Sequence, residues 1–236
     1  MSASADHDPP VLEPALDEAP GTGVNVVVEF RVSGLARYLS HAELMRVFLR
    51  AAIRSGLTLE YSHGYNPRPR LSVPLPKPVA IESEGDLCCV QVKVCPESGE
   101  DAGRRFSQQW PQGIELMSVR IAPRKASYQA EAADYRFPLK EARRTDELRN
   151  KALALLASES LVVDRRDGDG RAAWRRVDVR PFLDSVDVTD QGVTVHYRIS
   201  QTGSIRVGEA LDLLGLTQED LAGPIRRMAI RWCQAR

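Results

Sequence analysis

The sequence lacks a surplus of either charge. Its 236 residues carry 32 Lys and Arg against 32 Asp and Glu, so the formal net charge is zero. This balance excludes a nucleic-acid binder that relies on bulk charge, but it does not exclude a local basic patch, which depends on distribution. With 43% apolar and 27% charged residues, the composition is typical of a globular protein.

Cysteine is scarce and poorly spaced for ligating a metal or cluster. The four cysteines are Cys88, Cys89, Cys95 and Cys233, and no two of them form a CxxC pair. Because neighbours on a strand point to opposite faces, Cys88 and Cys89 are not expected to ligate one metal. No three cysteines are spaced closely enough for an iron–sulfur cluster. We therefore expect reduced, mostly buried thiols in a cytoplasmic protein that holds no metal and no cofactor.

Long apolar runs and the common enzyme motifs are missing too. The longest apolar runs are too short to span a bilayer, and the N-terminus lacks a signal peptide's apolar core, so neither membrane span nor leader is expected. The absence of GxGxxG and GxxxxGK[ST] argues against nucleotide cofactors, and GxSxG and HExxH are absent as well. His41-Ala42-Glu43 is half of the zinc deaminase signature, but no PCxxC follows it.

What the sequence does contain is an alternation of strands and helices. A capping box of Ser40 with Glu43 begins a predicted helix over residues 40–56, and Gly56 stands where a helix-ending glycine belongs. β-Branched and alternating residues predict strands over 24–33, 57–62, 86–94 and 113–122, with a second helix over 97–110. The order β-α-β-β-α-β is that of a ferredoxin-like unit.

The second half follows a similar order, with five predicted strands and two predicted helices. Its predicted strands cover 133–139, 159–166, 171–179, 192–200 and 225–232, its predicted helices cover 143–158 and 204–216, and a DGDG turn lies at 167–170. The fold class is therefore α+β, with tandem ferredoxin-like (βαββαβ) halves and antiparallel sheets. We divide the chain into a disordered acidic tail at 1–23, a first domain at 24–124 and a second at 125–236, joined near residues 123–130.

One loop carries most of the candidate recognition groups. In LEYSHGYNPRPRLSVPLP, residues 59–76, four prolines stiffen a backbone that presents aromatic, amide and guanidinium groups. Such groups suit single-stranded nucleic acid, because bases stack on aromatic rings and phosphates pair with guanidinium groups. The candidate nucleic-acid contacts in this loop are Tyr61, His63, Tyr65, Asn66, Arg68 and Arg70. The alternative is a structural strap, in which the tyrosines pack on a sheet and the prolines protect strand edges.

The helix that precedes this loop carries a second group of basic residues. Arg46, Arg50 and Arg54 recur every four residues and therefore share one face of the helix, and Arg37 lies just before it. Residues 31–70 hold seven arginines and only two acids, and residues 224–236 add four more arginines with no acid. This pattern indicates an anionic partner, and a solvated face is the alternative.

His41 is the candidate catalytic residue. It occupies the first position of the predicted helix, where the positive end of the helix dipole favours the neutral imidazole. A neutral imidazole can act as a general base. The alternative is a polar residue that suits a helix start and bonds locally.

These motifs resemble the bacterial family of radical-SAM-linked proteins, and the likeness covers most of residues 24–236. The closing segment SIRVGEALDLLGL, followed by IRR, is also similar to that family. Glu43 stands where the family has Asp, and Ser33 where Lys is common. The matching positions are Arg37, Leu39, Ser40, His41, Leu44, Tyr61, Ser62, Gly64, Tyr65, Asn66, Pro67, Pro69, Leu71 and Ser72.

The resemblance implies a partner and no activity. Members of the family occur beside radical SAM proteins or fused to them, which implies a radical SAM protein as the partner of this chain. Because the chain lacks cluster cysteines, it would be the separate partner of such an enzyme. The tandem pattern also resembles RNA-processing repeat-associated proteins of bacterial defence systems, although at the level of fold alone.

Three functions stay open at this point, and the sequence favours a binding module over an enzyme. The first is a non-catalytic accessory module that presents a transfer or ribosomal RNA to a radical SAM enzyme. The second is a metal-independent endoribonuclease with His41 as its general base. The third is a protein-only adaptor that docks on the radical SAM partner.

Overall fold

The β-branched run VNVVVEFRV forms the first strand of the fold, and seven of its nine residues are buried. The computed structural model describes residues 23–166 and 174–235. The acidic tail expected at 1–23 lies outside these described residues, except for Gly23. The DGDG turn and Arg236 lie outside them as well. Within the described ranges, no helix is long and apolar enough to cross a membrane.

The first half of the chain contains four strands, two α-helices and a 3-10 turn. Its helix α1 begins at the predicted capping box, in which the Ser40 hydroxyl accepts from the Glu43 amide, and Gly56 follows its end with a φ of 73°. The elements are β1 (Val24–Val32), η1 (Gly34–Tyr38), α1 (His41–Arg54), β2 (Leu71–Ser72), β3 (Glu82–Val92), α2 (Gly99–Ser107) and β4 (Ile114–Pro123).

The second half begins with β5, which continues through the second part of the segment that we placed at the joint. Its elements are β5 (Ser127–Pro138), η2 (Glu141–Arg143), α3 (Asp146–Ala157), β6 (Val162–Arg166), β7 (Trp174–Asp178), η3 (Arg180–Phe182), β8 (Leu183–Thr189), β9 (Gly192–Arg198), α4 (Val207–Leu214), η4 (Gln218–Asp220) and β10 (Arg226–Ala235).

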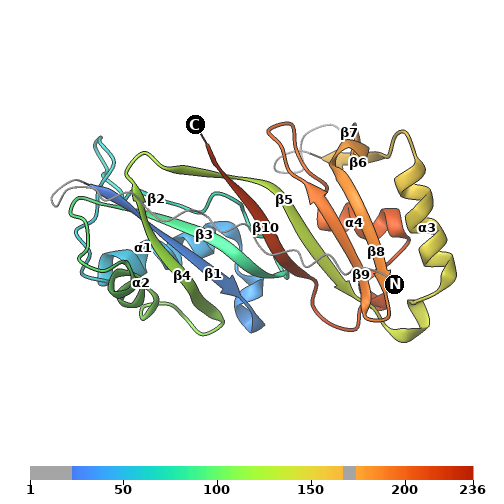
Figure 1. The fold of residues 1–236 in the computed structure, drawn as a ribbon, viewed down its shortest axis with the longest axis horizontal. Coiled ribbons are helices and arrows are strands. Elements are labelled where there is room, and N and C mark those ends of the chain that lie inside the picture. Colours follow the sequence, from blue (N-terminus) through green and yellow to red (C-terminus); the bar gives the residue numbers. More distant parts are fainter. Residues whose placement is uncertain (1–22, 167–173, 236) are drawn as a thin grey trace, which may run out of the picture.

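The two halves share one mostly antiparallel sheet, which fits the predicted α+β class. Its strand order is β4-β1-β3-β10-β5-β9-β8, and β2 also pairs with β3. Figure 1 shows the halves along the long axis of the molecule with β5 and β10 between them. β10 pairs with β5 along its length, but it pairs with β3 only at Arg226 and Arg227, in parallel. The β6–β7 hairpin forms a separate two-stranded sheet.

Helices cover one face of the sheet in each half, and the first half is covered on both faces. Leu44 and Phe48 of α1 pack on β1 and β3 in one core, and Leu148 and Leu211 mark the core of the second half. On the opposite face of the first half, Val27, Leu87 and Cys89 pack against side chains of β5 and β10, including Tyr128 and Trp232. The two halves therefore share buried apolar surface as well as a sheet.

The cysteines behave largely as their sequence positions indicate. All four are free; Cys88 and Cys89 are buried and lie in different cores on opposite faces of β3, whereas Cys95 and Cys233 are half-buried. Burial raises the pKa of the Cys88 thiol and raises that of Cys89 to about 11. Both thiols are therefore protonated and unreactive near neutral pH.

The structure corrects two of the sequence-based assignments. Residues 57–62 do not form a strand, because only isolated bridges form there, from Leu59 to Val92 and from Tyr61 to Pro69. The segment Leu183–Thr189, to which we assigned no element, is the edge strand β8. The remaining predicted strands and helices are present with shifted ends.

Candidate nucleic-acid interface

The segment between α1 and β2 forms a small irregular hairpin. The Ser62 amide donates to the Arg68 carbonyl at 2.8 Å, and the Arg68 amide donates to the Ser62 hydroxyl at 3.0 Å. One step closer to the sheet, the Arg70 amide donates to the Glu60 carbonyl at 2.7 Å. These bonds close residues 60–70 into one unit, which we call the hairpin loop.

The base of the hairpin loop is fastened to the edge of β3. The Glu60 amide donates to the Gln91 carbonyl at 2.9 Å, and the Gln91 amide donates to the Arg70 carbonyl at 2.9 Å. The buried Glu60 carboxylate accepts a bond from Arg124 and lies 3.9 Å from the Arg70 Nε. The loop is therefore anchored at its base by both backbone bonds and charge pairing.

The tip of the hairpin loop carries exposed polar and aromatic side chains. Tyr65 is 100% exposed, and His63, Asn66 and Arg68 are exposed beside it. Tyr61 is exposed as well. A structural strap would need these tyrosines to pack on the sheet; Tyr65 does not, whereas Tyr61 is 39% exposed and keeps part of its surface covered. A ring held wholly in water on an anchored loop is a feature of binding surfaces.

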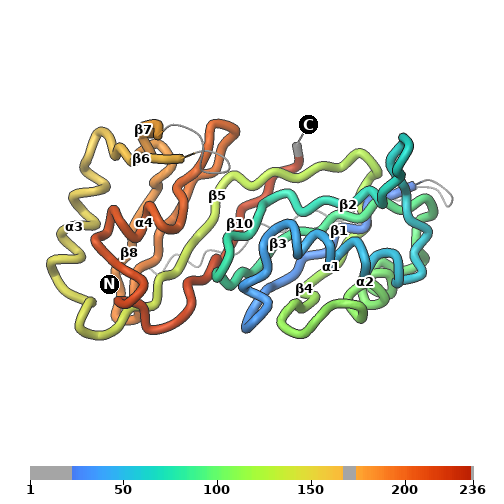
Figure 2. Tube along the Cα trace, turned by 180° about the vertical axis from the view of Figure 1, so that it is seen from behind, coloured from blue at the N-terminus to red at the C-terminus, as the bar shows by residue number. Residues whose placement is uncertain are grey.

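Arg46, Arg50 and Arg54 form an exposed row along α1, which we call the arginine stripe. Leu44, Phe48 and other apolar residues on the buried side of the helix fix this orientation. Figure 2 shows α1 running toward the end of the molecule where the segment before β2 projects. Within residues 23–166 and 174–235, Arg50, Arg54 and Arg68 form no ion pair, so their charges are available to an anion.

A groove of about 610 Å³ lies beside the base of the hairpin loop, on the face of the sheet that carries Cys89 and Tyr128. Ser62 and Arg70 of the loop line it together with Lys125. The side-chain oxygens of Asn25 and Gln91, which also line the groove, are buried and accept no hydrogen bond from any described residue. The groove thus combines two cations with two unused acceptors.

Arg37 and His41 lie at the other end of α1. The helix has 14 residues, so about 20 Å separates its start from the end that leads into the hairpin loop. Arg37 donates to the Gly34 carbonyl and the Tyr38 hydroxyl, both at 2.9 Å. The His41 Nδ1 is buried without a hydrogen-bond partner among the described residues. The predicted site residues therefore divide into two groups, and the larger group is at the hairpin loop.

Several residues that shape this region were missed in the sequence. Lys125 and Tyr128 fall in the segment that we took for a joint, and Asn25 is the one polar residue within the apolar run VNVVV. A polar side chain inside a buried strand is a signal that could have identified Asn25. Glu60 stood out only as one of the two acids among seven arginines.

Residues 224–236 do not present all of their arginines at the surface. Arg227 is 0% exposed and pairs with Asp86, which is 1% exposed, where β10 meets β3. Burial raises the pKa of the Asp86 carboxyl, although Arg227 favours its charged form. Burial also disfavours the charged form of Lys77 and lowers its pKa to about 8. The Lys77 ammonium donates to the carbonyls of Arg37, Pro78 and Ile81.

Comparison with known protein families identifies a bacterial family. A family model described as "Uncharacterized protein conserved in bacteria (DUF2344)" matches residues 25–208, which is most of the chain and includes the hairpin loop and the arginine stripe. No curated protein matches the sequence. Among the described residues, no group of three His, Cys, Asp or Glu side chains is arranged to hold a metal ion.

Proposed function

We propose that this chain, which belongs to that uncharacterized bacterial family, is a non-catalytic module that binds single-stranded RNA through the hairpin loop and the arginine stripe. The observation that carries the proposal is the anchored loop whose tip holds Tyr65 fully exposed beside Arg68. Single-stranded RNA offers a partner to each of these groups, because its bases stack on aromatic rings and its phosphates pair with guanidinium groups.

Groups on both sides of the hairpin loop would contact a bound RNA strand. On the helix side, Arg50 and Arg54 would pair with phosphates. On the groove side, the unpaired oxygens of Asn25 and Gln91 would accept hydrogen bonds from base amino groups. A strand that crosses the loop would therefore meet cations on one side and hydrogen-bond acceptors on the other.

The proposal includes a radical SAM enzyme as the partner that modifies the bound RNA, in the cytoplasm. The motif resemblance to radical-SAM-linked proteins supports this part. The proposal also includes a ferredoxin-like unit in each half. Its support is the strand order β4-β1-β3-β2 in the first half and β10-β5-β9-β8 in the second, with β6 and β7 as an inserted hairpin.

The ribonuclease alternative has less support. His41 lies about 20 Å along α1 from the hairpin loop, so a strand bound there would not reach the imidazole with the same nucleotides. The alternative predicts metal-independent RNA cleavage that disappears in His41→Ala. Incubating the chain with labelled RNA in EDTA and analysing the products on a denaturing gel tests it directly.

The proposed function is tested by fluorescence anisotropy of labelled transfer RNA and of a labelled single strand, at about 50 and about 200 mM salt. We expect affinity to fall with salt. In Arg50→Ala/Arg68→Ala, the slope of log affinity against log salt should decrease by about 1.4, because each neutralised phosphate contributes about 0.7. Tyr65→Ala should weaken binding at both salt concentrations, because stacking is not screened by salt.

The matched control is Arg149→Ala/Arg198→Ala, which removes the same charge from exposed positions of the second half. It should leave affinity and salt slope nearly unchanged. If the two double variants behave alike, or if neither RNA binds at low salt, the proposal that RNA binds at this surface is wrong. The protein-only adaptor would then be tested by co-purification with a radical SAM protein.

A further inference from the structure

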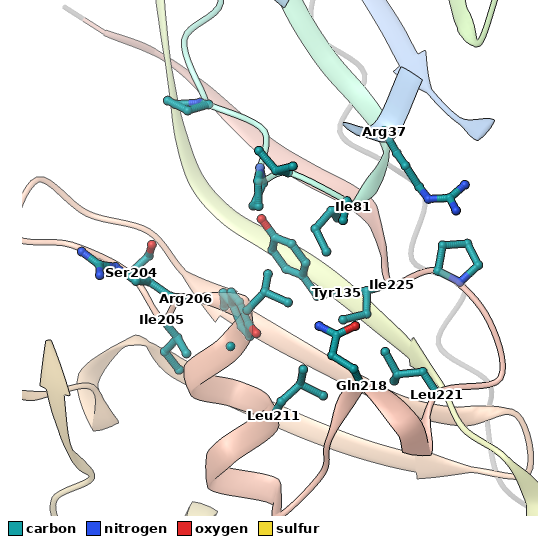
Figure 3. Close-up of a pocket in the computed structure, with 18 of the residues that line it drawn as sticks. Arg37, Ile81, Tyr135, Ser204, Ile205, Arg206, Leu211, Gln218, Leu221 and Ile225 are labelled. Atoms are coloured by element: carbon teal, nitrogen blue, oxygen red, sulfur yellow. The ribbon is translucent and has the colours of Figure 1, made fainter. Parts of the chain in front are cut away.

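A hollow of about 820 Å³ lies where the two halves meet, apart from the hairpin loop and its groove. This volume is in the range of small-molecule sites. The walls come from η1, the loop before β3, β5, β9 and the start of α4. Figure 3 shows Arg37 at one end of this hollow and Ser204 and Arg206 at the other, with Tyr135 and Gln218 between them. We call it the junction pocket.

Two stacked tyrosines form part of its floor. The rings of Tyr135 and Tyr197 lie 4.7 Å apart at 24°. Arg227 donates to the Tyr135 hydroxyl at 3.4 Å, which uses the oxygen of Tyr135 and leaves its hydrogen for another acceptor. Tyr197 is 2% exposed, and its hydroxyl has no hydrogen-bond partner in the described part of the chain. A buried, unpaired hydroxyl in a pocket wall is a contact that a ligand oxygen could complete.

The start of α4 gives the pocket an end that suits an anion. The first backbone N–H groups of a helix have no partner within the helix, and its dipole is positive there. Val207 and Gly208 of this first turn line the pocket, and a side-chain carbon at Gly208 would meet nothing within 4 Å. The nearby Glu209 carboxylate is paired with Arg165 at 2.8 and 2.6 Å, which offsets its charge.

The rest of the pocket suits a flat, weakly polar body. Ile81, Ile205, Leu211 and Ile225 supply apolar walls, and Gln218 supplies an amide with both a donor and an acceptor. A nucleobase has this combination, because its faces are apolar and its edge carries donors and acceptors. A phosphate is the anion that helix starts commonly bind.

We propose that the junction pocket binds a nucleoside monophosphate, either free or as the terminal nucleotide of an RNA. Its phosphate lies at the start of α4, and its base lies between the apolar walls within reach of Gln218 and Tyr197. The proposal does not depend on RNA binding at the hairpin loop, because the two sites share no residue.

The test is isothermal titration of the full chain with AMP and with UMP, with adenosine and inorganic phosphate as partial ligands. Gly208→Glu places a negative charge at the phosphate position, and Gly208→Gln has nearly the same size without the charge. An acid in the first turn also favours the helix, so the Glu variant should fold. We expect Gly208→Glu to bind AMP about tenfold more weakly than Gly208→Gln, as for the loss of a charge-assisted contact.

A second variant examines the other end of the ligand. Tyr197→Phe removes a hydroxyl that has no hydrogen-bond partner among the described residues, so the melting temperature should not fall, whereas affinity for the nucleotide should fall roughly three- to tenfold. Tyr128→Phe alters a buried tyrosine outside the junction pocket and is the matched control. Nucleotide binding should be the same in Tyr128→Phe as in the unaltered chain.

The outcomes separate this proposal from the RNA proposal. Absence of binding to millimolar AMP and UMP overturns it, and so does equal affinity in the two Gly208 variants. Competition of AMP by a 5′-phosphorylated oligonucleotide identifies the ligand as an RNA end, and binding of AMP alone identifies a free nucleotide. Arg50→Ala/Arg68→Ala should bind AMP normally even where it fails to bind RNA.

Discussion

The junction of the two halves contains a buried ion pair between Arg227 and Asp86. Arg227 and Asp86 are both withdrawn from water and pair with each other, and Arg227 also donates to Tyr135 and to the Pro76 carbonyl. A buried pair contributes little beyond what apolar residues would, but removing one partner strands the other charge. The junction therefore depends on both residues being present.

Replacing Arg227 by Met tests this dependence. We expect the free energy of unfolding to fall by about 3 to 5 kcal/mol, because Asp86 is left buried and unpaired. Urea denaturation near neutral pH measures the change. The double variant Asp86→Asn/Arg227→Met should recover part of the loss, since no unpaired charge remains. A single variant as stable as the unaltered chain would contradict the pairing.

His196 gives the fold a pH dependence. Its Nδ1 lies 2.7 Å from the Asp134 carboxylate and its Nε2 lies 3.0 Å from Asp187. The hydrogen bond to Asp134 raises the pKa of His196 above its usual 6.5, against the opposing effect of burial, and the charge of Asp134 and the hydrogen bond and charge of Asp187 add to the rise. The folded state therefore holds the proton more tightly. Its stabilisation is complete below the unfolded-state pKa and is lost as pH rises through the folded-state pKa.

His196→Gln should accordingly destabilise the chain at pH about 5.5 and have little effect at pH about 8.5. Because the site is partly exposed, the expected loss at low pH is at most about 1 kcal/mol. Urea midpoints of both proteins across this range measure it. A loss that is constant with pH would show that the imidazole contributes by packing and not by its charge.

At the scale of elements, the hairpin loop owes its fixed position to Glu60. The carboxylate is buried at the loop base and pairs with Arg124, the last residue of the first half. Its backbone also bonds to β3 and to Arg70. The loop tip can therefore remain open to solvent while its base stays in register with the sheet.

Glu60→Gln keeps the size of this side chain and removes its charge. We expect faster hydrogen exchange at the amides of Ser62 and Arg68, weaker RNA binding, and a stability loss of about 1 to 3 kcal/mol. Exchange measured by mass spectrometry or NMR follows the first effect. Glu115→Gln is the control, since it removes the charge from an exposed pair with Arg31 and should change stability little.

The elements that were predicted well from the sequence are those whose sequence signals lie within the element or next to it. Ser40, Glu43 and Gly56 lie within α1 or next to it, so the helix could be placed to within two residues. β8 was missed because the DGDG signal drew the strand assignments to the neighbouring hairpin. The loop residues were predicted as recognition groups from their types, which stays a prediction, and their hairpin shape was not predicted, because it depends on bonds to β3. The burial of Arg227 depends on Asp86, a residue 141 positions away.

At the scale of the whole molecule, the first half depends on the second. The face that carries Val27, Leu87 and Cys89 is covered by Tyr128 and Trp232, which both lie beyond residue 124. β10 also covers part of the outer edge of β3. The predicted division at residue 124 would therefore expose apolar surface that is buried in the full chain.

A fragment of residues 24–124 tests this. We expect it to bind a hydrophobic dye and to unfold at a lower urea concentration than the full chain, because its second face lies open to water. Circular dichroism during denaturation follows the unfolding. A fragment that unfolds cooperatively at the same midpoint, without binding dye, would instead show the first half to be an independent domain.

The position of β10 also has a consequence for the order in which the protein forms. β10 follows β1 and β3 in the chain by the whole length of the second half, so it leaves the ribosome long after them. Until it emerges, Asp86 lacks its partner Arg227 and the face around Leu87 lacks Trp232. β10 therefore supplies, after both β3 and β5 have been made, contacts that each half needs.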